Sequence, residues 1–166
     1  ATAFGYAICF NENDVRCMGR DAAGVRGIML TDGDYVVGAE KAEEGKTLLT
    51  VTQNGYGKRT ALTEYLRTGP NGEKQAQSRG GKGLKNYNIT PKTGNVAGCR
   101  VVSESDDVML IENGGVIIRI PASSINVYKR DVQGVIVMRI DDGNQVVSLE
   151  RVEKMDEEET GEEANA

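Results

Sequence analysis

The sequence repeats itself, and the period of the repeat constrains the fold more than any other feature. Three landmarks recur in each copy, namely a glycine, an arginine and a second glycine: Gly5, Arg20 and Gly24; Gly55, Arg79 and Gly83; Gly115, Arg130 and Gly134. The first and third copies are displaced by 110 residues, and the middle copy carries an insertion of nine residues, which we place within residues 68–75. A unit of about 50 residues that occurs three times predicts a repeat architecture.

Each unit is made of short apolar runs rich in β-branched residues. The runs 48–52 and 108–111 are followed by Asn-Gly turn signals, which are typical of hairpins. Further runs follow in the third unit at 116–120, 135–140 and 146–149. No window shows a sustained apolar period of 3.6 residues, so little helix is expected. Four short strands per unit predict an all-β, propeller-like β-pinwheel of four-stranded blades, with about three blades present.

The repeat also predicts the domain boundaries. Residues 1–45 form an incomplete blade, because only four residues precede Gly5 and the other units have a strand there. Residues 46–105 form a blade with a basic insertion, and residues 106–152 form the last blade. We therefore expect further blades upstream. The tail 153–166 holds one Lys and seven acids and is predicted to be a disordered acidic extension. It either remains solvated or competes with a polyanionic ligand for basic residues elsewhere in the chain.

Positive charge is concentrated in the middle of an otherwise acidic chain. The formal net charge is −5, yet residues 46–100 contain ten Lys and Arg against two acids. Such an imbalance favours binding of a polyanion. The predicted contacts with DNA phosphates are Lys58, Arg59, Arg67, Lys74, Arg79, Gly80, Gly81, Lys82, Lys85, Arg20 and Arg130.

Two groups within that set allow a second interpretation. The run Gly80–Gly83 taken alone is more typical of a flexible turn, but within this basic segment we favour a cradle whose backbone N–H groups bind a phosphate. Arg20, Arg79 and Arg130 occupy one position of the repeat, four residues before a glycine. Recurrence at one position suits a hydrogen bond that stabilises the blade as well as it suits a DNA contact.

Catalytic, metal-binding and membrane functions have little support in the sequence. The chain contains no His, and Cys9, Cys17 and Cys99 have no metal-ligand spacing. We expect the cysteines to be reduced core or strand residues. There is no apolar run of membrane-spanning length and no leader sequence, so we predict a cytoplasmic protein that contacts no membrane.

Several ordered motifs resemble one known family. The chain is similar to the C-terminal domain of the A subunit of bacterial DNA gyrase over essentially its whole length to about Val152, on these segments: 18–25, 52–60, 77–83 and 117–121, followed by the acidic tail. The family's hallmark box reads Gln-Arg-Arg-Gly-Gly-Lys-Gly; here Ser78 replaces its first Arg, so we interpret 77–83 as a box-like repeat copy.

The resemblance implies the C-terminal half of a six-bladed ring that binds double-stranded DNA on its basic outer rim and wraps it. The parent would be a type II topoisomerase that introduces negative supercoils with ATP, in a heterotetramer with the B subunit of gyrase and a second A subunit. The fragment itself would carry no catalytic residue and no cofactor, because ATP and magnesium are used through other domains.

Two alternatives remain open. The C-terminal domain of the A subunit of topoisomerase IV shares the repeat. A non-catalytic β-propeller scaffold for protein interactions would fit the four-strand period, but it leaves the basic segment unexplained. A propeller enzyme would need converging acids or His, and the sequence offers no such cluster.

Overall fold

The computed structural model describes residues 1–152, and the predicted acidic tail 153–166 lies outside the described residues. Within 1–152 the chain contains strands and short 3-10 helices but no α-helix, as the sequence predicts. The strands are β1 (Tyr6–Ala7), β2 (Thr47–Thr52), β3 (Tyr56–Ala61), β4 (Arg67–Thr68), β5 (Lys74–Gln75), β6 (Leu84–Lys85), β7 (Val96–Val102), β8 (Asp107–Glu112), β9 (Ile117–Pro121), β10 (Val135–Ile136) and β11 (Val146–Val152); the 3-10 helices are η1 (Glu12–Asp14), η2 (Leu62–Tyr65) and η3 (Ala122–Ser124).

Tight hairpins join the long strands at the positions that the Asn-Gly signals predict. β2 pairs with β3 and β8 pairs with β9, both antiparallel. Gly55 lies in the first turn with a φ of 78°, which favours glycine. Thr52 fixes that turn, because its Oγ1 accepts a hydrogen bond of 3.2 Å from the Tyr56 N–H.

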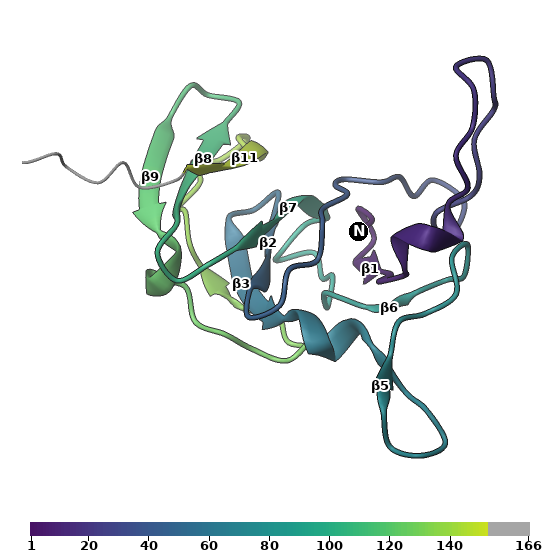
Figure 1. The fold of residues 1–166 in the computed structure, drawn as a ribbon. Helices are drawn as coiled ribbons and strands as arrows, with labels where there is room; N and C mark the ends of the chain where they lie inside the picture. Colours follow the sequence, from purple (N-terminus) through teal and green to yellow (C-terminus); the bar gives the residue numbers. More distant parts are fainter. Residues whose placement is uncertain (153–166) are drawn as a thin grey trace, which may run out of the picture.

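The sheets exchange strands between consecutive units. The four-stranded sheet has the order β10-β3-β2-β7, and β10 comes from the third unit whereas the other strands come from the second. In the same way β6 of the second unit pairs with β1 of the first. The sequence predicts four strands per unit, but β6 and β10 in fact pair with strands of the preceding unit, and Figure 1 shows β6 beside β1. Consecutive units are therefore joined by main-chain hydrogen bonds as well as by side-chain packing.

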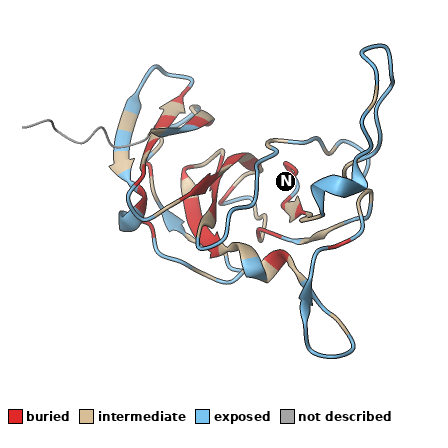
Figure 2. Cartoon of the chain, in the orientation of Figure 1, coloured by how far each residue is buried: buried red, intermediate tan, exposed pale blue. Residues whose placement is uncertain are grey.

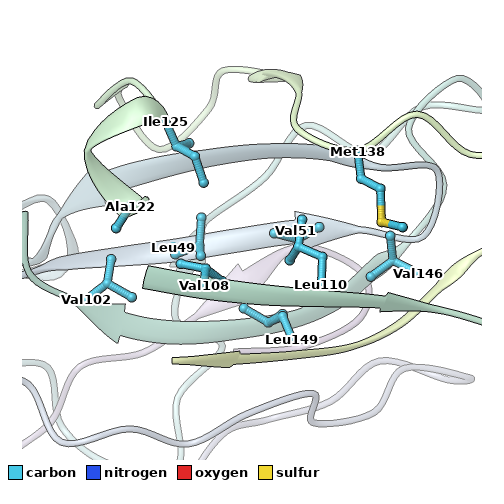
Figure 3. Packing of buried hydrophobic residues seen from close by; sticks show 10 residues of the cluster. All are labelled: Leu49, Val51, Val102, Val108, Leu110, Ala122, Ile125, Met138, Val146 and Leu149. Carbon is cyan, nitrogen blue, oxygen red and sulfur yellow. The ribbon is translucent and has the colours of Figure 1, made fainter. Parts of the chain in front are cut away.

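The main hydrophobic core lies where the sheets of the second and third units face each other. Leu49 and Val51 from β2 pack with Leu110 from β8, and all three side chains are completely buried (Figure 3). Burying one such side chain contributes about 1.5 to 3 kcal/mol. Buried residues concentrate in these facing strands, while the outlying loops are exposed (Figure 2).

A second cluster covers the other face of the middle sheet. Leu48 alternates with Leu49 along β2 and packs with Tyr65, Cys99 and Ala7 of the first unit. The middle sheet is thus buried on both faces, which explains why β2 is apolar without a clear alternation.

The cysteines are all free thiols, and they differ in exposure. Cys99 is buried and Cys9 is partly buried, as expected for strand or core residues, but Cys17 is exposed, so the prediction is wrong for that residue. Across the described part of the chain, no helix has the length and apolar character needed to span a membrane.

Candidate nucleic-acid interface

The glycine-rich turn 77–83 is hydrogen-bonded to the first unit. Gln77 is buried, and its main-chain N–H donates a hydrogen bond of 2.8 Å to the carbonyl of Cys9 in the first unit. The Gly80 N–H donates to the Gly27 carbonyl at 2.8 Å. That amide is therefore not free for a phosphate, and the prediction of a cradle is wrong at Gly80. Gly81 stays exposed.

Gly83 allows the strands β1 and β6 to approach each other closely. Its φ is +77°, and a Cβ built on it would lie 2.4 Å from the Ala7 carbonyl oxygen. Only glycine allows β6 to come this close to β1 at a positive φ. The glycines of the box-like motif are therefore explained in large part by contacts between units.

Two of the recurrent arginines bind the preceding unit. The Nε of Arg79 donates to the Asp14 carbonyl at 3.1 Å, and its Nη1 donates to the Arg26 carbonyl. The Nη1 of Arg130 donates to the Lys85 carbonyl at 2.9 Å. The equivalent residue of the first unit, Arg20, is exposed. Of the two interpretations of this position, the blade-stabilising one is supported by these bonds, and Arg79 and Arg130 remain half-buried rather than fully presented to solvent.

Lys58 and Arg59 are interior residues, which corrects the prediction that they present charge on a rim. Lys58 has no exposed surface, and its ammonium donates to the carbonyls of Lys129 and Arg130. Arg59 is 4% exposed; its Nε donates to the Ile125 carbonyl at 2.6 Å and its Nη1 pairs with Glu104 at 2.7 Å. Both side chains therefore form hydrogen bonds that link the second and third units. The charge pattern of the sequence does not predict the burial of these two residues, because it results from the third unit, which covers strand β3.

Burial also makes the charged form of Lys58 less favourable. Desolvation lowers the pKa of this lysine from 10.5 to about 8, although the nearby Asp131 opposes the shift. The ammonium also lies 5.1 Å from the centre of the Tyr87 ring, a favourable cation–π distance.

Lys82 and Lys85 are the exposed cations beside the box-like turn. The Lys82 ammonium lies 5.0 Å from the centre of the Tyr6 ring. Lys85 pairs with Tyr6 in the β1–β6 ladder, and its ammonium donates to the Asn88 Oδ1 at 3.0 Å. Together with the half-buried guanidinium groups of Arg79 and Arg130, they follow the junction formed by β6. We call these four residues the β6 strip.

The predicted insertion forms the β4–β5 hairpin, which carries two further cations. Arg67 and Lys74 are both exposed on it, and the Lys74 ammonium donates to the Thr68 Oγ1 at 3.1 Å. The hairpin projects from the body, and the loop between η1 and β2 projects from a different side (Figure 1). Arg20 belongs to that loop, so the structure does not bring it together with Arg67 and Lys74.

Two other cations of the basic segment differ from what the charge pattern predicts: the charge of one is neutralised, and the other is an additional exposed cation. Arg100 pairs with Glu150 at 2.7 Å and with Glu40 at 3.6 Å, so its charge is locally neutralised. Lys92 was not predicted as a contact, yet it is exposed and lies 5.5 Å from the centre of the Tyr56 ring. The recurrence of a tyrosine after the hairpin glycine, at Tyr6 and Tyr56, is the sequence signal that could have identified it.

Comparison with known proteins agrees with the repeat and the fold. The family model described as "DNA gyrase C-terminal domain, beta-propeller" matches residues 1–43, 46–74, 75–103 and 106–153. The A subunit of DNA gyrase from Staphylococcus epidermidis strain ATCC 12228 is 42% identical over 94% of this chain, and that from Escherichia coli K12 is 40% identical over 95%. The chain spans only 17% of the length of each of these relatives.

Solved structures with the same fold include both kinds of topoisomerase domain. A DNA gyrase A C-terminal domain superposes with a TM-score of 0.79 and 30% identity, over 90% of this chain and 48% of that one. The C-terminal domain of a DNA topoisomerase IV superposes with a TM-score of 0.80 and 27% identity, over 92% of this chain and 45% of that one. The family model covers nearly all of the chain, and the chain therefore belongs to the DNA gyrase C-terminal domain family of β-propellers.

Proposed function

We propose that this chain is a DNA-binding and DNA-wrapping module of the A subunit of a DNA gyrase. The observation that carries the proposal is the exposure of Lys82 and Lys85 on the β6 strip, with no carboxylate paired to either within residues 1–152. Lys92 and the hairpin cations Arg67 and Lys74 extend the positive surface. Contacts of this kind hold phosphates and carry no base sequence.

Bending would follow from phosphate contacts on consecutive units of a curved array. Smooth bending of a 20 to 30 base-pair site costs on the order of 1 to 6 kcal/mol, so sequence preference would reflect the deformability of the DNA. We assign this module to an ATP-dependent type II topoisomerase of the cytoplasm, where its partners are the B subunit of gyrase and a second copy of the A subunit. ATP and magnesium are assigned to other parts of that assembly, and no step of the proposal passes through them.

A salt series on duplex DNA tests the binding. With about four to five phosphate contacts, log K should fall with log salt with a slope of roughly −4. The double variant Lys82→Gln/Lys85→Gln should reduce the steepness by about 2 and weaken binding about tenfold at low salt. Fluorescence anisotropy of a labelled duplex measures both quantities.

A variant pair with the same loss of charge serves as the control. Lys46 pairs with Glu43 at 2.7 Å and Arg119 pairs with Asp107 at 2.8 Å, so Lys46→Gln/Arg119→Gln removes two cations that are already neutralised. The control should bind like the parent chain. An affinity that does not depend on salt would instead support the protein-interaction scaffold.

The second candidate, a module of the A subunit of topoisomerase IV, is favoured by the TM-score of 0.80 to such a domain. Sealing nicked circular DNA in the presence of the chain separates the two. A wrapping gyrase module should shift the linking number of the sealed circles, whereas a module that only bends DNA should leave it unchanged.

A further inference from the structure

The recurrent arginines make the same hydrogen bond at both junctions between units. The Nη1 of Arg130 donates to the Lys85 carbonyl at 2.9 Å. The Nη1 of Arg79 donates to the Arg26 carbonyl. Arg26 and Lys85 occupy one position of the repeat, because each lies six residues after the recurrent arginine of its own unit, and Ile136 occupies this position in the third unit. We call residues 26, 85 and 136 the rim position.

The side chain at the rim position changes from unit to unit, although its place in the fold does not. Lys85 pairs with Tyr6 in β6, and Ile136 pairs with the equivalent Tyr56 in β10. Arg26 and Lys85 are exposed cations, and no carboxylate pairs with either in the part of the chain that the structure describes. Ile136 is 56% exposed and has no charge. The third unit therefore presents an apolar group where the other two present a cation.

The charge of the turn before the rim position changes in the same way. Residues 79–85 contain three cations and no acid, residues 20–26 contain two cations and one acid, and residues 130–136 contain one of each. Gln133 of the third unit also stands where the second unit has Lys82. Since a phosphate backbone is bound through positive charge, this turn of the third unit should bind it least.

Arg26 lies beside the glycine-rich turn of the second unit. A Cβ built on Gly80 would lie 3.9 Å from both the Cβ and the Cδ of Arg26. The Met29 N–H donates to the Gly81 carbonyl at 2.9 Å, so this segment of the first unit follows the turn that carries Lys82. The exposed side chain of Arg26 therefore extends the positive surface of the β6 strip onto the first unit.

We propose that Arg26 is a DNA-phosphate contact, and that the row of phosphate contacts at the rim position ends with Lys85 because Ile136 replaces the cation. The inference rests on the proposed binding of DNA and adds a direction to it: a duplex that follows the outer strands is held at the first and second units and more weakly at the third. Phosphate contacts position a duplex without reading its bases. The missing cation therefore changes the path of the DNA and not its sequence preference.

Substitutions at the two ends of the row test the proposal in opposite directions. Arg26→Gln should reduce the steepness of log K against log salt by about 1 and weaken binding about threefold at low salt. Ile136→Lys should increase the steepness by about 1 and tighten binding about threefold. Arg26→Lys, which keeps the charge, should bind like the parent chain. The main-chain carbonyl that accepts the bond from Arg79 is retained in both variants of residue 26, and fluorescence anisotropy of a labelled duplex measures the affinities.

Two controls make the same changes of charge away from the rim position. Arg16→Gln removes an exposed arginine from the same loop, and Val147→Lys adds a cation to the third unit at a residue that is 55% exposed. Both should keep the affinity and the salt dependence of the parent chain.

Three results would overturn the proposal. A control that matched its rim-position variant would show a general effect of charge, and rim-position variants that left the salt dependence unchanged would show no contact there. Either result would leave the salt-dependent binding of the parent chain, and with it the proposed function, in place. A parent chain whose affinity did not depend on salt would overturn both.

Discussion

Replacing Gly55 by alanine should lower the free energy of unfolding by about 4 kcal/mol or more, because two separate penalties fall on one position. Its φ of +78° strains any residue that has a Cβ. In addition, a Cβ there would lie 2.0 Å from the Met138 carbonyl oxygen of the third unit. The main chain must move apart, which weakens the hydrogen bonds that the Val137 and Met138 N–H groups donate to the Gly55 carbonyl.

The repeat supplies a matched control for this prediction. Gly115 occupies the same position of the third unit and has a φ of +95°, but among residues 1–152 nothing lies within 4 Å of the place that a Cβ would take. Gly115→Ala should therefore cost only the strain of the backbone, about 1 kcal/mol. Urea denaturation of both variants measures the difference. Equal losses would mean that the contact between units contributes nothing at Gly55.

The second large effect is a rise in stability with pH that depends on Lys58. Its pKa is about 8 in the folded chain and 10.5 when unfolded, so between these values the unfolded state binds more protons. The contribution of Lys58 to the free energy of unfolding should therefore rise by about 2 kcal/mol between pH 8 and pH 10. Other buried groups act in the opposite direction, because burial raises the pKa of Cys9 and Cys99 and, at higher pH, that of Tyr65 and Tyr87.

Lys58→Met isolates this contribution, because methionine fills a similar volume without a charge. The free energy of unfolding of the parent chain, measured relative to that of the variant, should rise by about 2 kcal/mol between pH 8 and pH 10, whatever the stability of the variant at neutral pH. Urea denaturation at several pH values in that range provides the measurement. A difference between parent and variant that does not change with pH would contradict the prediction.

The architecture was largely predictable from the sequence, because it follows from periodicity. The recurrence of Gly5, Gly55 and Gly115 sets the hairpins, and the β-branched runs set the strands. What periodicity does not reveal is which unit a strand pairs with. Val135 follows β9 along the chain, yet it pairs with Gly57 of the preceding unit.

The candidate site was less predictable, because the sequence does not reveal which unit covers each strand. A positive charge on a strand is exposed only if the covering layer leaves that face open. Lys58 and Arg59 lie in β3, which receives β10 along its edge, so their charges point into a junction. Lys85 lies in the short strand β6 and Lys82 lies two residues before it, and both remain exposed. Both pairs of cations belong to the same basic segment of the sequence. Only their positions relative to the neighbouring units make the first pair buried and the second pair exposed.

The exchange of β10 also determines when each sheet can be finished during synthesis. Translation delivers β2, β3 and β7 well before Val135 and Ile136, so the middle sheet must wait with an open edge until the following unit leaves the ribosome. Assembly thus runs from the amino end towards the carboxyl end, with each newly made unit closing the one before it. Chains interrupted within the third unit would release an unfinished edge, the kind of surface on which strands of other molecules aggregate.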